Sequence, residues 1–266
     1  MERLPTVIFL TGSGGGTPDL SVFKTDPNDA TSIELIGYPD WRRCIADDFS
    51  AEVLVAELVA EIERKVPRGP IYMIGLSLGG HLGYVAGLRL QAMGREVAGL
   101  CAIDSFMVVS SEPSSGWKSR ALDEGLGLLR ERRLGDFVEF LKSKFWRTLL
   151  RIAGSRLLNL LRRFSFDRVP LISDPILERE LNMRLLVRET APWLAKLDQE
   201  PAILDVPTVL LRTRQSAADD GAWQCRCPNI KIFEIAGKHH SFFEAENISS
   251  LRRVFLTATG EWRALQ

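Results

Sequence analysis

Residues 71–80 read Ile-Tyr-Met-Ile-Gly-Leu-Ser-Leu-Gly-Gly, and they join a buried strand to a helix through a glycine-bounded turn. The pattern Gly75-x-Ser77-x-Gly79 between a strand and a helix is typical of a nucleophile elbow. Its glycines leave room for a tight, strained turn that lifts the serine hydroxyl above the sheet, and the helix directs its N-terminal amides toward developing negative charge. The stretch therefore predicts Ser77 as a nucleophile at the end of a strand.

Segments of strand and helix character alternate on both sides of this turn. One helical segment has apolar residues at helical spacing, as at Leu54, Leu58 and Ile62, after Ser50 as a candidate N-cap. The predicted strands are 6–11, 32–37, 71–74, 97–103, 206–212 and 230–235, and the predicted helices are 50–66, 78–93 and 246–255. This alternation indicates an α/β fold with a mostly parallel central sheet and helices on both faces.

The stretch between strands 97–103 and 206–212 breaks the alternation. From about Ser105 to Gln199 it has the pattern of helices, with Gly135 and Gly154 as expected break points. Residues 116–168 hold thirteen Lys or Arg against six Asp or Glu, so this segment is basic. We expect residues 1–266 to form one domain with a helical lid inserted at about residues 105–204, above the sheet edge.

Composition and charge narrow the class of protein. The chain carries 34 Lys and Arg against 34 Asp and Glu, which argues against a nucleic-acid binder with a basic surface. The apolar run Val7 to Leu10 is too short for a signal peptide, and no stretch approaches the roughly 20 apolar residues that span a bilayer. The four cysteines lack Cys-x-x-Cys spacing, which gives no sign of a disulfide framework or a zinc site. We expect a cytoplasmic protein without stable membrane insertion, bound metal or cofactor.

A serine hydroxyl needs a base within hydrogen-bond reach, and the chain has three histidines. His81 falls in the first turn of the helix after Ser77, and we expect it to be structural. His239 and His240 follow the last predicted strand, where the chain order nucleophile, acid, histidine places the base. We predict His239 as that base.

The histidine in turn needs a carboxylate that holds its tautomer. Asp104 ends strand 97–103, and the carboxyl end of a strand is where open α/β sheets bind ligands. The rival acids are Asp219 and Asp220, in the loop after strand 206–212, although their Ser-Ala-Ala-Asp-Asp-Gly setting is also typical of a solvated turn. Asp104 is our first prediction, and the two rivals stay open.

An acyl-transfer intermediate needs two preorganised donors for its oxyanion. We expect one to be the backbone amide of Leu78. The other is expected from the loop Thr-Gly-Ser-Gly-Gly-Gly at 11–16, with the amide of Ser13 as the candidate. The same loop invites a dinucleotide-binding interpretation, which fails because a glycine would be needed where Thr17 stands.

Residues 71–106 are similar to the thioesterase domains that terminate nonribosomal peptide and polyketide assembly lines, which have the α/β-hydrolase fold. The likeness rests on Gly-Leu-Ser-Leu-Gly-Gly at 75–80, on the placement of Asp104 after the next strand, and on Gly-Lys-His at 237–239. The loop after the first strand also matches, with Thr11 where proline is usual. The resemblance covers about two thirds of the chain and is weak in the insertion.

This resemblance implies acyl transfer in two steps. The chain to be released would arrive as a thioester on the phosphopantetheine arm of an acyl or peptidyl carrier protein, Ser77 would become acylated, and hydrolysis or cyclisation would release the product. The arm arrives with the carrier protein, so no resident cofactor is implied. The insertion would be the lid of such an enzyme. Its cations and apolar residues could dock an acidic carrier protein, or they could simply be solvated and core-packing residues.

Two other functions stay open at this point. A carboxylesterase or lipase would use the same side chains on oxygen esters, and a non-catalytic protein of the hydrolase fold would only bind its ligand. Rates on acyl-pantetheine thioesters and on p-nitrophenyl esters of matched chain length distinguish a thioesterase from a carboxylesterase or lipase. Labelling of Ser77 by a fluorophosphonate distinguishes an enzyme from a non-catalytic binding protein, because labelling requires an activated hydroxyl.

Overall fold

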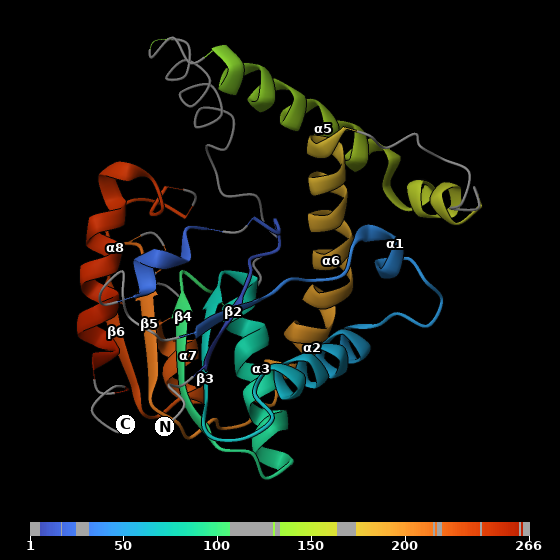
Figure 1. Cartoon of the computed structure of the whole chain (residues 1–266). Helices are drawn as coiled ribbons and strands as arrows, with labels where there is room; N and C mark the ends of the chain where they lie inside the picture. Colours follow the sequence, from blue (N-terminus) through green and yellow to red (C-terminus); the bar gives the residue numbers. More distant parts are fainter. Residues whose placement is uncertain are drawn as a thin grey trace. The chain divides into compact units, whose positions relative to one another are not determined.

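A six-stranded sheet forms the centre of the fold in the computed structural model of the chain (Figure 1). The structure describes residues 6–16, 18–24, 32–106, 130, 134–163, 174–214, 216, 220–239, 241–260 and 262, with the backbone alone at 136 and 153–163. The strands are β1 (Thr6–Leu10), β2 (Ser32–Ile36), β3 (Ile71–Leu76), β4 (Val97–Ile103), β5 (Thr208–Arg212) and β6 (Ile230–Glu234). Their order is β2-β1-β3-β4-β5-β6 and every pair is parallel, which confirms the predicted fold class.

The register of the sheet brings the carboxyl ends of its strands to one edge. The pairs nearest this edge are Leu10 with Gly75, Leu76 with Ile103, Ile103 with Leu211, and Arg212 with Glu234. The residues that follow β3, β4 and β5 are Ser77, Asp104 and Thr213, so they leave neighbouring strands at the same level. Side chains far apart in the sequence therefore meet at this edge.

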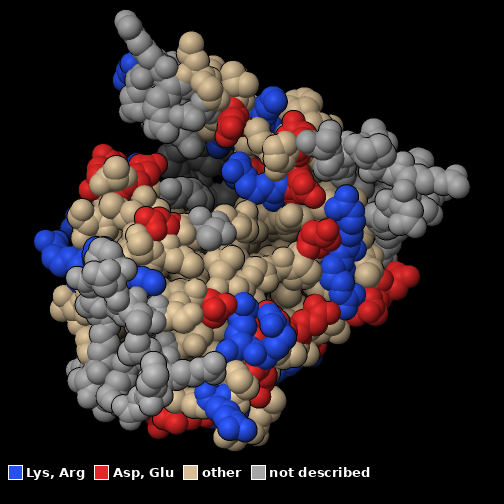
Figure 2. All heavy atoms as spheres, viewed as in Figure 1, with Lys and Arg blue, Asp and Glu red and all other residues tan. Residues whose placement is uncertain are grey.

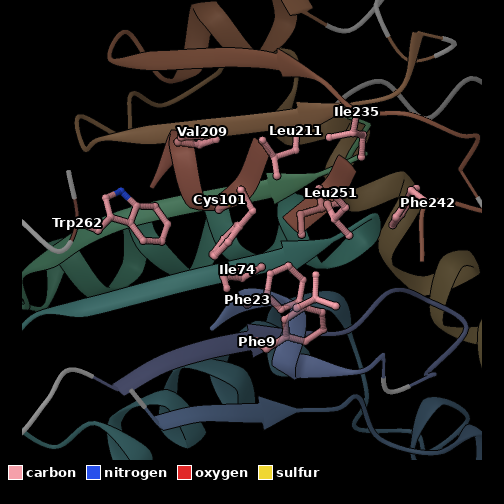
Figure 3. Close-up of a cluster of buried hydrophobic side chains, with 14 of the residues drawn as sticks. Phe9, Phe23, Ile74, Cys101, Val209, Leu211, Ile235, Phe242, Leu251 and Trp262 are labelled. Atoms are coloured by element: carbon pink, nitrogen blue, oxygen red, sulfur yellow. The ribbon is translucent and has the colours of Figure 1, made fainter. Parts of the chain in front are cut away.

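Side chains alternate between the two faces of the sheet, and each face is covered by helices. On one face, Phe9, Ile74 and Leu211 belong to a buried apolar cluster with residues of the short helix η1 (Leu20–Phe23) and of α8 (Ala245–Ala258) (Figure 3). The other face is covered by α2 (Ala51–Lys65) and α3 (Leu78–Ala92). The core is thus divided between two layers, as expected for a parallel sheet that is buried on both sides.

The helix boundaries follow local signals where these are strong. The Ser50 hydroxyl accepts a hydrogen bond from the Val53 amide at 3.2 Å, which confirms the predicted N-cap of α2. Three short helices were not predicted, namely η1, α1 (Trp41–Cys44) and α7 (Asp220–Arg226). They are too short to show a helical period in the sequence.

The chain divides into two compact units, and the second holds residues 39–49 and 109–189. The first holds the remainder and contains the sheet. The second includes α1, α5 (Leu134–Arg163) and most of α6 (Pro175–Leu197). Residues 107–129, 131–133 and 164–173 of the expected insertion lie outside the described ranges.

A buried carboxylate links α5 to α6 within the second unit. Glu180 accepts hydrogen bonds from the Ser143 hydroxyl and from Nε of Arg147, both at 2.6 Å. The helix α5 continues through Gly154, so the predicted break there is wrong. A single glycine costs a helix about 1 kcal/mol, which the remaining turns of a 30-residue helix can absorb.

Charges of both signs are interspersed on the face seen in Figure 2, in agreement with the equal numbers of acidic and basic residues. Among the described residues, no helix has both the length and the apolar character needed to cross a bilayer.

Candidate active site

The turn from β3 into α3 has the strained backbone of a nucleophile elbow. Ser77 has φ 52° and ψ −118°, in a region that side-chain-bearing residues rarely occupy. A Cβ atom on Gly79 would come within 2.5 Å of the Leu10 carbonyl oxygen, and one on Gly75 would collide with the backbone of Gly79. Only glycine fits at these two positions, because Gly79 packs against the end of β1 and Gly75 packs against the backbone of the turn itself.

The hydroxyl of Ser77 meets the imidazole of His239. Ser77 Oγ lies 3.1 Å from His239 Nε2 although 162 residues separate the two in sequence. His239 follows β6 in a turn where the Lys238 amide donates to Ser241 Oγ at 2.9 Å. His240 lies outside the described residues. Of the three histidines, the structure thus pairs His239 with Ser77.

The carboxylate of Asp104 completes the arrangement. Oδ2 of Asp104 lies 2.6 Å from His239 Nδ1, and the Asp104 side chain is fully buried. A carboxylate only accepts, so Nδ1 donates to it, and the neutral ring then presents Nε2 as an acceptor for the Ser77 proton. The structure brings these three predicted side chains together in the order needed for proton transfer, and their catalytic roles stay a prediction.

Hydrogen bonds keep Asp104 ionised in spite of its burial. Burial by itself raises the pKa of this carboxyl, but hydrogen bonds from His239, from the Ser216 hydroxyl and from the Thr213 amide outweigh it, so the pKa is lowered. Asp104 also has φ 45°, in the left-handed region, and its amide donates to the Leu211 carbonyl at 2.7 Å. The carboxylate therefore stays anionic at neutral pH.

The loop after β5 supplies two residues that the sequence did not single out. The Thr213 amide and the Ser216 hydroxyl donate to Oδ1 of Asp104 at 2.8 and 2.6 Å. The rival acid Asp220 instead accepts from Nε of Arg212 at 2.7 Å, and Asp219 lies outside the described residues. Only the position of this loop in the sequence could have pointed to it, because the loop follows β5, the strand next to β4.

Two aromatic rings lie beside the imidazole of His239. The ring centroids of Phe106 and Phe242 lie 5.2 and 6.3 Å from that of His239. The loop that carries Phe106 is held by Trp223, whose indole nitrogen donates to the Ser105 carbonyl at 2.9 Å. These contacts limit the orientations that the His239 ring can take.

His81 is buried away from water, and its predicted role is structural. Its Nε2 lies 3.7 Å from Oδ1 of Asp198, and the Asp198 carboxylate accepts from Arg226 at 2.7 Å. Burial, and then the charge of Arg226, lower the pKa of His81 to about 4. The ring is therefore uncharged at neutral pH.

The predicted oxyanion loop follows β1 and reaches the serine. A Cβ atom on Gly12 would lie 3.6 Å from Cβ of Ser77, so the backbone of this loop passes beside Ser77. Ser13 and Gly14 form the turn that follows, closed by a hydrogen bond from the Gly15 amide to the Gly12 carbonyl at 3.0 Å. The amides of Ser13 and Leu78 stay predicted donors. In the described part of the chain, no group of three or more His, Cys, Asp or Glu is arranged to hold a metal ion.

A serine on a strained strand-to-helix turn, with a histidine and a carboxylate at the same edge of a parallel sheet, defines the α/β-hydrolase class. The model of one family within this class, described as the thioesterase domain, matches residues 34–181. The chain belongs to this thioesterase domain family, and it is a hydrolase.

Comparisons with known proteins also confirm the resemblance to synthase thioesterase domains. The chain is 30% identical over 118 residues to a non-reducing polyketide synthase, terA, of Aspergillus terreus, a match that covers 44% of this chain and 6% of that protein. The NocB thioesterase domain, solved as a covalent complex with a fluorophosphonate nocardicin G analogue, has a TM-score of 0.61 at 17% identity, over 96% of this chain and 94% of that one. The Vlm2 thioesterase domain has a TM-score of 0.59 at 17% identity, over 95% and 91%. At these identities the structures establish the fold.

Proposed function

We propose that the chain releases an acyl or peptidyl group from the phosphopantetheine thioester of a carrier protein through an acyl-enzyme on Ser77. The observation that carries this proposal is the pair of contacts from Ser77 Oγ to His239 Nε2 and from His239 Nδ1 to Asp104 Oδ2, in a chain of the thioesterase domain family. Similarity to terA and to the NocB and Vlm2 domains supports a carrier-bound substrate.

In the first half of the proposed reaction, Ser77 Oγ attacks the thioester carbonyl while Nε2 of His239 takes the hydroxyl proton. The negative charge on the carbonyl oxygen would be bound by the amides of Leu78 and Ser13. The C–S bond then breaks, and the imidazolium gives its proton to the departing thiolate, which leaves as a thiol. Asp104 stabilises the imidazolium in between without taking up the proton.

In the second half, water or a nucleophile within the acyl chain gives its proton to Nε2 of His239 and attacks the ester carbonyl of acylated Ser77. Collapse of the intermediate breaks the ester bond and returns the proton to Oγ. Water would release a carboxylic acid, and an internal hydroxyl or amine would release a ring. Both outcomes regenerate the serine.

We also propose that residues 1–266 form one hydrolase domain with a helical lid at about 105–204, and that the lid helps to bind the carrier protein. Support comes from α5, whose residues 140–163 contain seven Lys or Arg and no Asp or Glu. Large apolar side chains are exposed along the same helix, at Leu134, Val138, Leu141, Phe145, Leu149 and Ile152. A surface with cations beside apolar residues suits an acidic protein partner.

A cytoplasmic location completes the proposal. The four cysteines are all free, which fits a reducing compartment.

Intact-protein mass spectrometry tests the reaction directly. The chain is incubated with acyl-pantetheine thioesters of several lengths, and a gain of the acyl mass on Ser77 is expected for the wild type but not for Ser77→Ala. Rates on p-nitrophenyl esters of the same acyl groups are measured in parallel. A strong preference for oxygen esters would support a carboxylesterase instead, and no acylation by any ester or fluorophosphonate would support a binding protein.

The carrier-protein part is tested separately by charge reversal on α5. We expect Lys142→Glu combined with Lys144→Glu to raise KM for an acylated carrier protein about tenfold at low salt and to leave KM for acyl-pantetheine unchanged. Equal effects on both substrates would contradict the docking role.

A further inference from the structure

The two oxygens of the Asp104 carboxylate have separate sets of partners. Oδ2 faces the imidazole, at 2.6 Å from His239 Nδ1. Oδ1 accepts from the Thr213 amide at 2.8 Å and from the Ser216 hydroxyl at 2.6 Å. Thr213 and Ser216 are both buried, so these two donors act where water does not compete.

The direction of each proton in this group follows from the chemistry of the carboxylate. An ionised carboxylate only accepts, so the single hydroxyl proton of Ser216 is committed to Asp104. Thr213 Oγ1 lies 3.2 Å from Ser216 Oγ, and with the Ser216 proton already used, the Thr213 hydroxyl must be the donor in that pair. The result is a chain of two hydrogen bonds, from the Thr213 hydroxyl to the Ser216 hydroxyl and from there to Oδ1, in which the first bond strengthens the second.

Asp104 needs such support because its backbone is strained. A residue with a side chain at φ 45° costs of order 1 to 3 kcal/mol and persists only where its surroundings fix it. If Oδ1 were free, the carboxylate could rotate about its last side-chain bond and lose its alignment with the imidazole. Two donors on Oδ1 oppose this rotation.

We propose that Ser216 is a positioning residue for the acyl-transfer reaction, and that its hydroxyl holds the Asp104 carboxylate with Oδ2 toward His239. This inference rests on the proposed function, because it assigns a role within the same site. The inference also assigns a role in the reaction to the loop after β5, although the predicted acid itself lies after β4. Ser216 acts through Asp104 and His239.

Substitutions at position 216 test the inference with a matched pair. Threonine keeps a hydroxyl and valine has nearly the same shape without one, so Ser216→Thr and Ser216→Val share any effect of added volume. We expect Ser216→Ala and Ser216→Val to lower kcat/KM about 10- to 100-fold, the range of a lost hydrogen bond to a charged group. Ser216→Thr should keep kcat/KM within about threefold of the wild-type value, because it keeps the hydroxyl donor. Equal rates for the threonine and valine variants would overturn the inference.

A pH profile separates positioning from loss of fold. The Ser216 hydrogen bond helps to lower the pKa of Asp104, so its removal makes the carboxylate more basic. A more basic carboxylate at 2.6 Å favours the protonated ring of His239, which cannot act as a base, so the acidic limb of the kcat/KM profile moves to higher pH. The His239 Nδ1 proton, observed by NMR, should change its chemical shift in Ser216→Ala. A variant that only loses thermal stability, with its acidic limb and this resonance unchanged, would overturn the positioning role.

Thr213→Val serves as the control in the same loop, because it removes one buried hydroxyl but keeps the backbone amide that binds Asp104. We expect a smaller loss than in Ser216→Ala, and a loss as large would assign the effect to the loop as a whole and contradict the inference. Failure of the proposed function has a different signature, since the wild type itself would then not be acylated.

Discussion

Acid should destabilise the fold through His81. The perturbation is a fall in pH from about 7.5 to about 4, a window in which an ordinary histidine with its pKa near 6.5 takes up a proton. In the folded chain, burial and the neighbouring Arg226 lower the pKa of His81 to about 4. The unfolded chain therefore binds a proton that the folded chain does not bind until much lower pH, and stability must fall with pH.

The size of the effect follows from these two pKa values. The difference of about 2.5 pKa units, at 1.36 kcal/mol each, gives a loss of about 3 kcal/mol by pH 4, where half of the folded molecules have taken up the proton. The loss begins near the unfolded pKa of 6.5 and is complete below the folded pKa. Asp198, with Oδ1 at 3.7 Å from Nε2, is the acid that would face the added positive charge on His81.

Urea unfolding at a series of pH values, on wild type and on His81→Gln, measures this effect. The glutamine has no proton to gain, so the stability difference between the two proteins should change by about 3 kcal/mol across the window. An NMR titration of the His81 ring gives its folded pKa independently. Parallel stability curves for the two proteins would refute the reasoning, because they would show that His81 is protonated equally in both states.

Two further predictions concern the acid and the elbow. Asp104→Asn should lower kcat about a thousandfold or more, because an amide no longer selects the required tautomer of His239. Asp220→Asn should keep a kcat near that of the wild type. The reverse result in kinetic assays would place the acid after β5. Gly79→Ala should lower the free energy of unfolding by about 1 to 3 kcal/mol or more through its clash with β1. Gly135→Ala, at the second residue of α5 with open space around it, should change it by less than about 0.5 kcal/mol. Equal melting temperatures for the two alanine variants would contradict this account of the turn.

Much of the fold could be predicted because buried parallel strands are nearly continuous apolar runs. The strand predicted at 97–103 is β4 without change, and the one predicted at 206–212 begins two residues later, at Thr208. Helix α2 was identified by its serine cap and its helical period. The course of α5 through Gly154 could not be predicted, because a glycine signal does not reveal how much the flanking turns stabilise the helix.

The convergence of Ser77, Asp104 and His239 was predictable from chain order and from the rule that parallel strands end at one edge. The hydroxyl of Ser216 was not. A serine in a polar loop is usually solvated, and only the folded structure shows that this one is buried against a carboxylate. Partners of a functional residue depend on the exact path of a loop, which has no period and few local signals.

The strained backbone of Ser77 also bears on how the protein would evolve in the laboratory. Glycine adopts positive φ without the penalty that serine incurs there, so Ser77→Gly is expected to melt at a higher temperature than the wild type. A screen for heat resistance alone would therefore favour variants without the hydroxyl. Directed evolution of this chain should select for turnover in every round, so that heat resistance is not gained by losing the predicted nucleophile.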